Sequence, residues 1–198
     1  MENKVQYGFK NAYYAVLTET EGEGGVITAS YGTPKKLGPG RTAKADPKAE
    51  SEDYYADDVI LDTFATMDGY DIEVAVTELP DSFRKDVLGD VVDSNGVLLE
   101  NPTGKTNPFA LMFEFDGDIK ARRHVFYNCK AERPSMEGAT SEGKIDPKEQ
   151  TIKITAKKSK AAAIDRIKAS TTDTTSTTVY NNWYTAVQLP GSISGGSE

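Results

Sequence analysis

The chain has very few of the side chains that build metal centres and nucleophilic active sites. Among its 198 residues there is one cysteine, Cys129, and one histidine, His124. A single cysteine allows no disulfide within the chain, and a single histidine cannot supply a multi-histidine or Cys₂His₂ metal site. No apolar run approaches the ~18 residues of a membrane-spanning helix. We therefore expect a soluble chain with no metal, no cofactor and no membrane partner.

Basic residues are also in the minority. Lys and Arg number 23 against 31 Asp and Glu, which gives a net charge of −8. Nucleic-acid-binding proteins neutralise phosphates with a basic face, so this balance disfavours tight DNA or RNA binding. The hydrophobic fraction of 37% suffices for one folded domain but favours long exposed loops or tails.

Two segments resemble phosphate-binding or calcium-binding loops, and both lack a required residue. Gly104-Lys105-Thr106 matches the end of a phosphate-binding loop, but Leu99 stands where that loop needs its first glycine. Asp93-Ser94-Asn95-Gly96 matches the middle of a calcium loop, but Val91 stands at the position of the first acidic ligand. We interpret both segments as plain turns.

His124 is the only candidate for a catalytic base. Cys129 lies five residues further on, and in a regular strand this spacing places the two side chains on opposite faces. That geometry argues against a catalytic dyad. An enzyme built around His124 is therefore the least favoured of the functions considered.

Strand patterns outnumber helix patterns, so the sequence predicts a mainly β protein. Only one short helix is predicted, over residues 82–88, with Asp81 as its N-cap and Gly89 as its C-cap. An Asp-Gly pair between two apolar runs is a strong hairpin signal, and it occurs at Asp116-Gly117. The predicted strands are 13–17, 26–31, 54–64, 70–79, 97–99, 109–115, 120–129 and 151–155, with a turn at Asp68-Gly69 between the third and fourth.

The remaining segments are predicted as arms and linkers. Residues 32–54 are rich in Gly and Pro and poor in large apolar side chains. They form either a long surface loop or an extended hairpin that packs on something outside its own domain. A Ser/Thr-rich link begins at Ser170, and residues 191–198 are predicted as a flexible tail. We thus expect one domain over 1–190, with a loop arm at about 32–54 and a C-terminal arm at about 170–190.

Several stretches of the chain together, in this order, resemble one protein family. That family is the major tail proteins, or tail tube proteins, of long-tailed, siphophage-type bacteriophages of Gram-positive hosts. No single stretch is chemically diagnostic, but the ordered set covers the chain from about Val5 to Pro190. The stretches are Tyr7-Gly8-Phe9-Lys10-Asn11, Pro80 to Gly89, Asn95-Gly96-Val97-Leu98, the hairpin Phe109 to Cys129 with its Phe115-Asp116-Gly117-Asp118 tip, and Tyr180-Asn181-Asn182-Trp183.

The resemblance implies a fold, an assembly and a location. The fold is an antiparallel β-sandwich, or barrel-like tail tube fold, with one short flanking helix and extended loop and terminal arms. Subunits form hexameric rings, and rings stack into a tube that conveys duplex DNA. The implied partners are further copies of the chain, the tape measure protein, and the tail terminator and distal tail proteins. The implied location is the virion tail, assembled in the host cytoplasm, and the family has no catalytic residues.

From this resemblance we predict two sets of functional residues. Acidic side chains would line the lumen, because a basic wall would hold the DNA in place. In the predicted strand 70–79, Ile72, Val74 and Val76 alternate with Asp71 and Glu73, which leaves one face of the strand acidic. The lumen candidates are Glu50, Glu52, Asp53, Asp57, Asp58, Asp71 and Glu73. The candidates for inter-subunit arms are Lys35, Lys36, Arg41, Tyr180, Trp183 and Tyr184.

A different class of function also fits the composition. A monomeric β-sandwich module could bind a ligand or cell-wall glycan on an aromatic platform made by Tyr54, Tyr180 and Trp183. A purely structural interpretation of Trp183 and its neighbouring tyrosines is a small apolar anchor that fixes the C-terminal segment. The corresponding interpretation of the acidic strands is an ordinary solvent-facing surface.

Overall fold

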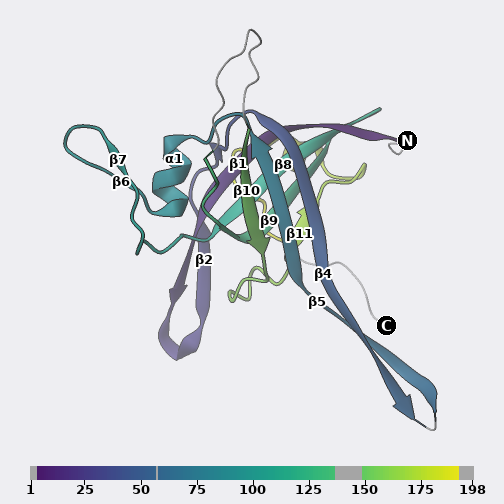
Figure 1. Ribbon diagram of the computed structural model, residues 1–198. Coiled ribbons are helices and arrows are strands. Elements are labelled where there is room, and N and C mark those ends of the chain that lie inside the picture. Colours follow the sequence, from purple (N-terminus) through teal and green to yellow (C-terminus); the bar gives the residue numbers. More distant parts are fainter. Residues whose placement is uncertain (1–3, 57, 137–148, 192–198) are drawn as a thin grey trace, which may run out of the picture.

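A computed structural model describes residues 4–56, 58–136 and 149–191 (Figure 1). Antiparallel strands dominate it, so the predicted mainly β class is confirmed. The helical elements are the 3₁₀ turn η1 (Glu23–Gly25), α1 (Asp81–Phe83), the π-helical turn η2 (Arg84–Leu88) and α2 (Thr177–Asn181). The strands are β1 (Gln6–Glu21), β2 (Ile27–Tyr31), β3 (Lys35–Lys36), β4 (Gly40–Ala56), β5 (Val59–Val76), β6 (Val91–Val92), β7 (Leu98–Leu99), β8 (Phe109–Gly117), β9 (Arg122–Ala131), β10 (Gln150–Ala156) and β11 (Lys168–Ser170).

One large sheet carries most of the described chain. Its strand order is β2-β1-β8-β9-β10-β5-β4, with β3 also pairing with β1 and β11 with β9. The predicted hairpin β8–β9 is present, and the predicted strands 13–17 and 26–31 lie in the antiparallel hairpin β1–β2. A separate pair, β6–β7, surrounds the predicted turn at Asp93–Gly96.

The central strand β8 is buried on both faces. Because successive side chains of a strand alternate, Phe109, Leu111 and Phe113 enter one apolar cluster, whereas Ala110 and Met112 enter another. The first cluster, the inner core, also takes Ile72, Val74 and Val76 from β5. The second cluster lies on the other face of β1, β8 and β9, under the C-terminal segment that contains Ile164 and Trp183.

The sheet curls until strands far apart in its order approach each other. A β-carbon at Gly40 on β4 would collide with the ring of Phe9 on β1, so a side chain there would keep the two strands apart. The backbone N–H of Leu37 donates to the carbonyl of Ala12, which ties the segment before β4 to β1. The result is the sandwich-like arrangement of β1 and β8 against β5 that encloses the inner core.

The predicted flanking helix is present over residues 81–88 with the predicted C-cap but a different N-cap. Pro80, not Asp81, is the N-cap residue, and α1 passes at once into the π-helical turn η2. Phe83 and Val87, one turn apart, are both buried in the inner core. Gly89 ends the helix at φ +79°, the left-handed conformation that favours glycine.

The segment predicted as a loop at residues 32–54 is largely strand. Of the two interpretations of that segment, the extended hairpin is the one observed, because β4 pairs along its whole length with β5. The turn predicted at Asp68-Gly69 is wrong, since β5 runs through it. Gly69 has a φ of +149°, but the chain reverses between Ala56 and Val59 instead.

A β-bulge in β9 overturns the predicted faces of His124 and Cys129. Between the pairs Phe109–Cys129 and Leu111–Phe126, one residue of β8 lies opposite two residues of β9, Tyr127 and Asn128. The extra residue inverts the alternation, so Cys129 lies in the inner core, and His124 packs on Phe113 of the same core. The opposite placement holds only for a regular strand.

Candidate interaction surfaces

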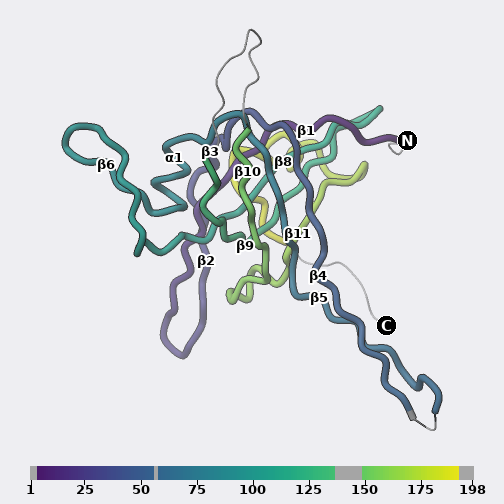
Figure 2. The backbone as a smooth tube through the Cα atoms, viewed as in Figure 1, coloured from purple at the N-terminus to yellow at the C-terminus, as the bar shows by residue number. Residues whose placement is uncertain are grey.

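The hairpin of β4 and β5 extends well beyond the body of the molecule (Figure 2). Residues 40–46 of β4 pair with β5 beside the inner core, where Ile72 and Val74 are buried. From Gly69 toward the tip of the hairpin, the two strands pair only with each other within the described part of the chain. We call residues 49–67 the hairpin arm.

The hairpin arm exposes large apolar side chains of the kind that protein interfaces bury. Leu61 is 66% exposed and Phe64 56% exposed. Exposed apolar side chains gathered on one segment mark an interaction site in soluble proteins. The other exposed large apolar side chains of the arm are Tyr54, Tyr55, Val59, Ile60 and Met67.

The hairpin arm is also acidic. Glu50, Glu52, Asp53 and Asp58 are exposed there, and Asp57 lies outside the described residues. The hydroxyl of Thr63 donates to Asp53 Oδ1 at 2.7 Å, which confirms the pairing of Asp53 with Thr63 across the hairpin. Lumen candidates and exposed apolar groups therefore share one protrusion.

The other two lumen candidates lie on the outward face of β5 and have basic neighbours. Asp71 and Glu73 are exposed, opposite the buried Ile72, as predicted. Pairing brings Lys153 of β10 and Lys44 of β4 to either side of Glu73. Lys48 Nζ lies 2.9 Å from Asp71 Oδ1.

The acidic face inferred from β5 alone is thus a mixed-charge face in the sheet. Lysines from the neighbouring strands share it, so one subunit does not present an acidic wall there. The lumen role of Asp71 and Glu73 stays a prediction, and the charge argument for it is weaker than the sequence of β5 indicates.

The three basic arm candidates lie at the surface and pair within their own subunit. Lys35 Nζ lies 2.7 Å from Asp86 Oδ2, and Arg41 Nε lies 2.7 Å from Glu149 Oε1. Lys36 is exposed and pairs in β3 with Tyr13 of β1. Contacts of these residues with a second subunit stay predictions.

The three aromatic arm candidates pack on the sheet of their own subunit. Trp183 is 4% exposed within the second apolar cluster, and the ring of Tyr184 stacks on Tyr13 with centroids 4.8 Å apart. Arg123 lies 3.8 Å from the centroid of the Tyr180 ring and donates to the Tyr180 carbonyl. The apolar anchor is the interpretation of Trp183 that the structure supports.

A buried ion pair fixes this C-terminal segment. Glu114 of β8 is 3% exposed and accepts a 2.9 Å hydrogen bond from Arg123 Nε. It also accepts from Asn11 Nδ2 at 2.7 Å and from the Tyr184 hydroxyl at 3.1 Å. Burial and the adjacent Glu114 raise the pKa of Tyr184, so its hydroxyl stays protonated and keeps donating.

A comparison with known protein families identifies the family of this chain. The family model described as "Phage tail tube protein" matches residues 3–188. The chain belongs to the phage tail tube protein family. A search of curated proteins gives no match. Proteins of this family are structural components of the phage tail. The resemblance that we drew from several sequence stretches in their order along the chain is confirmed.

The aromatic platform of a glycan-binding module is not assembled in this tail tube protein. Trp183 is buried against β8 and β9, and Tyr180 lies beside Arg123. Tyr54 is instead on the hairpin arm, which points away from that region (Figure 1). The three aromatic side chains do not share a surface.

His124 sits in an apolar environment. It is 7% exposed, and its ring lies 5.5 Å from that of Phe113 and 5.6 Å from that of Phe115. Neither imidazole nitrogen has a hydrogen-bond partner among the described residues. Burial, with the nearby charges of Lys168 and Arg122, lowers the pKa of His124 to about 4. The described residues contain no cluster of three metal-ligating side chains, and none of their helices is long and apolar enough to cross a membrane.

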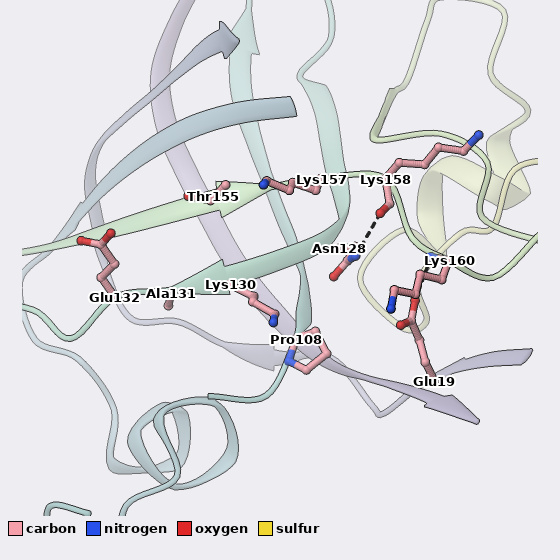
Figure 3. Close-up of a pocket in the computed structure, with 10 residues that line it drawn as sticks. All are labelled: Glu19, Pro108, Asn128, Lys130, Ala131, Glu132, Thr155, Lys157, Lys158 and Lys160. Carbon is pink, nitrogen blue, oxygen red and sulfur yellow. Dashed lines mark hydrogen bonds between the residues drawn. The ribbon is translucent and has the colours of Figure 1, made fainter. Parts of the chain in front are cut away.

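One surface was missed in the sequence. Lys130, Lys157, Lys158 and Lys160 line a groove of about 600 Å³ beside β9 and β10, which we call the lysine groove (Figure 3). The run from Lys157 to Lys160 was the only sequence signal for it. Lys130 joins that run because β9 pairs with β10.

Proposed function

We propose that this tail tube protein assembles into stacked hexameric rings that enclose a channel for duplex DNA. The observation that carries the proposal is the hairpin arm, which exposes Leu61, Phe64 and five other large apolar side chains to solvent. At about 25 cal/mol per Å² of buried apolar surface, covering such a segment is a strong driving force for association. The hairpin projects from one side of the subunit, so its contacts are with other molecules (Figure 2).

The sheet edges support the same proposal. β4 is the end strand of the sheet order, and a long unpaired edge is a template for another chain. Contacts between two different surfaces of identical subunits generate rings when the rotation closes and filaments when it does not. We further infer assembly in the host cytoplasm, with the tape measure, tail terminator and distal tail proteins as the neighbours of the tube.

The first experiment tests assembly with the full chain. The purified protein is concentrated and followed by sedimentation velocity and negative-stain microscopy, and rings or tubes are expected. Leu61→Asn with Phe64→Asn removes two exposed apolar groups of the arm and is expected to lower the assembled fraction at least tenfold. Val26→Asn is the matched control, because Val26 is 61% exposed on a different hairpin. A wild-type protein that stays monomeric under all these conditions contradicts the proposal.

The channel role is tested separately by charge reversal. We infer that Asp71 and Glu73, the lumen candidates outside the hairpin arm, face the passing DNA, and phage carrying Asp71→Lys and Glu73→Lys are expected to assemble tails and to eject DNA more slowly. Lys105→Glu on an exposed loop is the control for a change of charge alone. Ejection at the normal rate from reversed tubes shows that these residues do not line the channel.

A further inference from the structure

We propose that the lysine groove receives the hairpin arm of a second copy of this chain. The inference rests on the proposed function, because it needs copies of the chain to associate. It adds which surface accepts the arm and what chemistry selects it. The arm contributes carboxylates and apolar side chains, and the groove contributes ammonium groups and lysine stems.

The lysine groove is lined by four segments that the fold brings together, namely Glu19 of β1, Pro108 before β8, residues 128–132 and residues 155–160. Lys130 lies on the outward face of β9, beside Thr155 of β10, and the chain then continues through Lys157 and Lys158. Asn128 Nδ2 donates to the Lys158 carbonyl at 3.3 Å. Figure 3 shows these side chains, with Pro108 between Lys130 and Glu19.

Glu19 at the groove holds this segment in place. It accepts hydrogen bonds from the hydroxyl of Ser159, which is buried, and from the backbone N–H of Lys160 at 3.2 Å. The loop after β10 is thereby fixed to β1. The Glu19 carboxylate therefore accepts hydrogen bonds from the loop, and the neighbouring Lys157 and Lys158 stay exposed.

The groove is positively charged, in contrast to the chain as a whole. Its lining has four lysines against the two acidic residues Glu19 and Glu132. Among the described residues none of the four lysines forms an ion pair within the subunit. An anionic partner from outside is the complement of such a surface.

The hairpin arm has the complementary properties. No Lys or Arg occurs between residues 49 and 83, and Glu50, Glu52, Asp53 and Asp62 of the arm are all exposed. The arm's exposed Tyr54, like its other apolar groups, needs a surface with apolar parts, which Pro108, Ala131 and the lysine stems provide. The arm runs away from its own body, so the groove that it enters belongs to another copy (Figure 1).

A cross-link between two copies tests the contact directly. Cys129 is buried, so it does not interfere with an engineered pair. Glu52→Cys is mixed with Lys157→Cys under assembly conditions and oxidised. A covalent dimer made of one chain of each kind is expected, at least fivefold above the yield with Lys85→Cys in place of Lys157→Cys. Lys85 is exposed on η2 and does not line the groove.

Charge reversal tests whether the ion pairs drive docking. Lys130→Glu with Lys157→Glu and Lys158→Glu is expected to lower assembly at least tenfold, and so is Glu50→Lys with Glu52→Lys and Asp53→Lys. Mixing the two reversed proteins is expected to restore assembly, because each groove then meets an arm of opposite charge. The matched control, Lys85→Glu with Lys105→Glu, is expected to assemble like the wild type.

The outcomes separate this inference from the proposed function. If the wild type forms no rings or tubes, the proposed function fails first. If the wild type assembles and the groove-reversed protein assembles equally well, the proposed function stands and the groove does not receive the arm. If reversal leaves assembly intact but abolishes binding of a duplex DNA fragment, the groove is a polyanion site and the inference is wrong.

Discussion

The buried His124 makes the stability of the subunit depend on pH in a calculable way. Its pKa is about 4 in the folded chain, against about 6.5 for an ordinary histidine, because burial and the positive Lys168 and Arg122 disfavour the imidazolium. Between these two values the unfolded chain binds a proton that the folded chain does not. Stability is therefore complete above pH 6.5 and falls as the pH decreases toward 4, below which this group contributes no further change.

The magnitude follows from the two pKa values. Each pH unit between them costs about 1.4 kcal/mol, and the linkage relation gives a loss of about 2 kcal/mol from pH 7.5 to pH 5. His124→Phe removes the titrating group and keeps a ring between Phe113 and Phe115. The variant is therefore expected to lose about 2 kcal/mol less than the wild type over the same interval.

Urea denaturation of the dilute, unassembled subunit measures this difference. Fluorescence of Trp183, the only tryptophan, reports unfolding because its side chain is buried. Carboxylates titrate in both proteins and cancel in the comparison. Lys168→Gln removes a nearby positive charge and is expected to shrink the loss in an otherwise wild-type chain. Equal losses in wild type and His124→Phe, within about 0.5 kcal/mol, would refute the reasoning.

Three further substitutions test packing and backbone constraints by thermal and urea unfolding. Trp183→Ala empties part of the second apolar cluster and is expected to cost about 3 kcal/mol while loosening the C-terminal segment, measured by limited proteolysis. Arg133→Met leaves Asp90, whose side chain is 3% exposed, without its 2.8 Å ion pair, and is expected to cost about 3 kcal/mol. Gly69→Ala places a β-carbon against the Ala156 carbonyl at φ +149°, and a loss of at least about 2 kcal/mol is expected. A loss under about 0.5 kcal/mol in any of the three contradicts the contact it tests.

The sequence predicts strands well where the strand itself carries the signal. The β8–β9 hairpin has apolar runs and an Asp-Gly turn, and it is observed close to its predicted bounds. Strand β4 has almost none of these features, since Pro47 and a run of acidic residues lie in it. It is a strand because β5, with Val59, Ile60 and Phe64, offers a continuous partner. Pairing energy of this kind cannot be read from one segment alone.

Surfaces were harder to predict than strands, because pairing between strands mixes residues from distant parts of the chain. Glu73 belongs to an acidic pattern in the sequence, yet Lys44 and Lys153 flank it in the sheet. Lys130 and Lys157 line one groove only because β9 and β10 are neighbours. The bulge in β9 turned the face of Cys129 in the same way, through a local shift that alternation cannot reveal.

The composition of the hairpin arm affects whether free subunits aggregate through it. An exposed edge with large apolar groups such as Leu61 and Phe64 is an aggregation hazard unless charge opposes like-with-like pairing. Every charge of the arm is negative, so two arms repel each other, and the repulsion extends over roughly 8 Å at physiological salt. A surface of opposite charge removes this repulsion and lets the apolar groups make contact. The same composition thus disfavours symmetric arm-to-arm pairing and favours the head-to-tail contact that we propose.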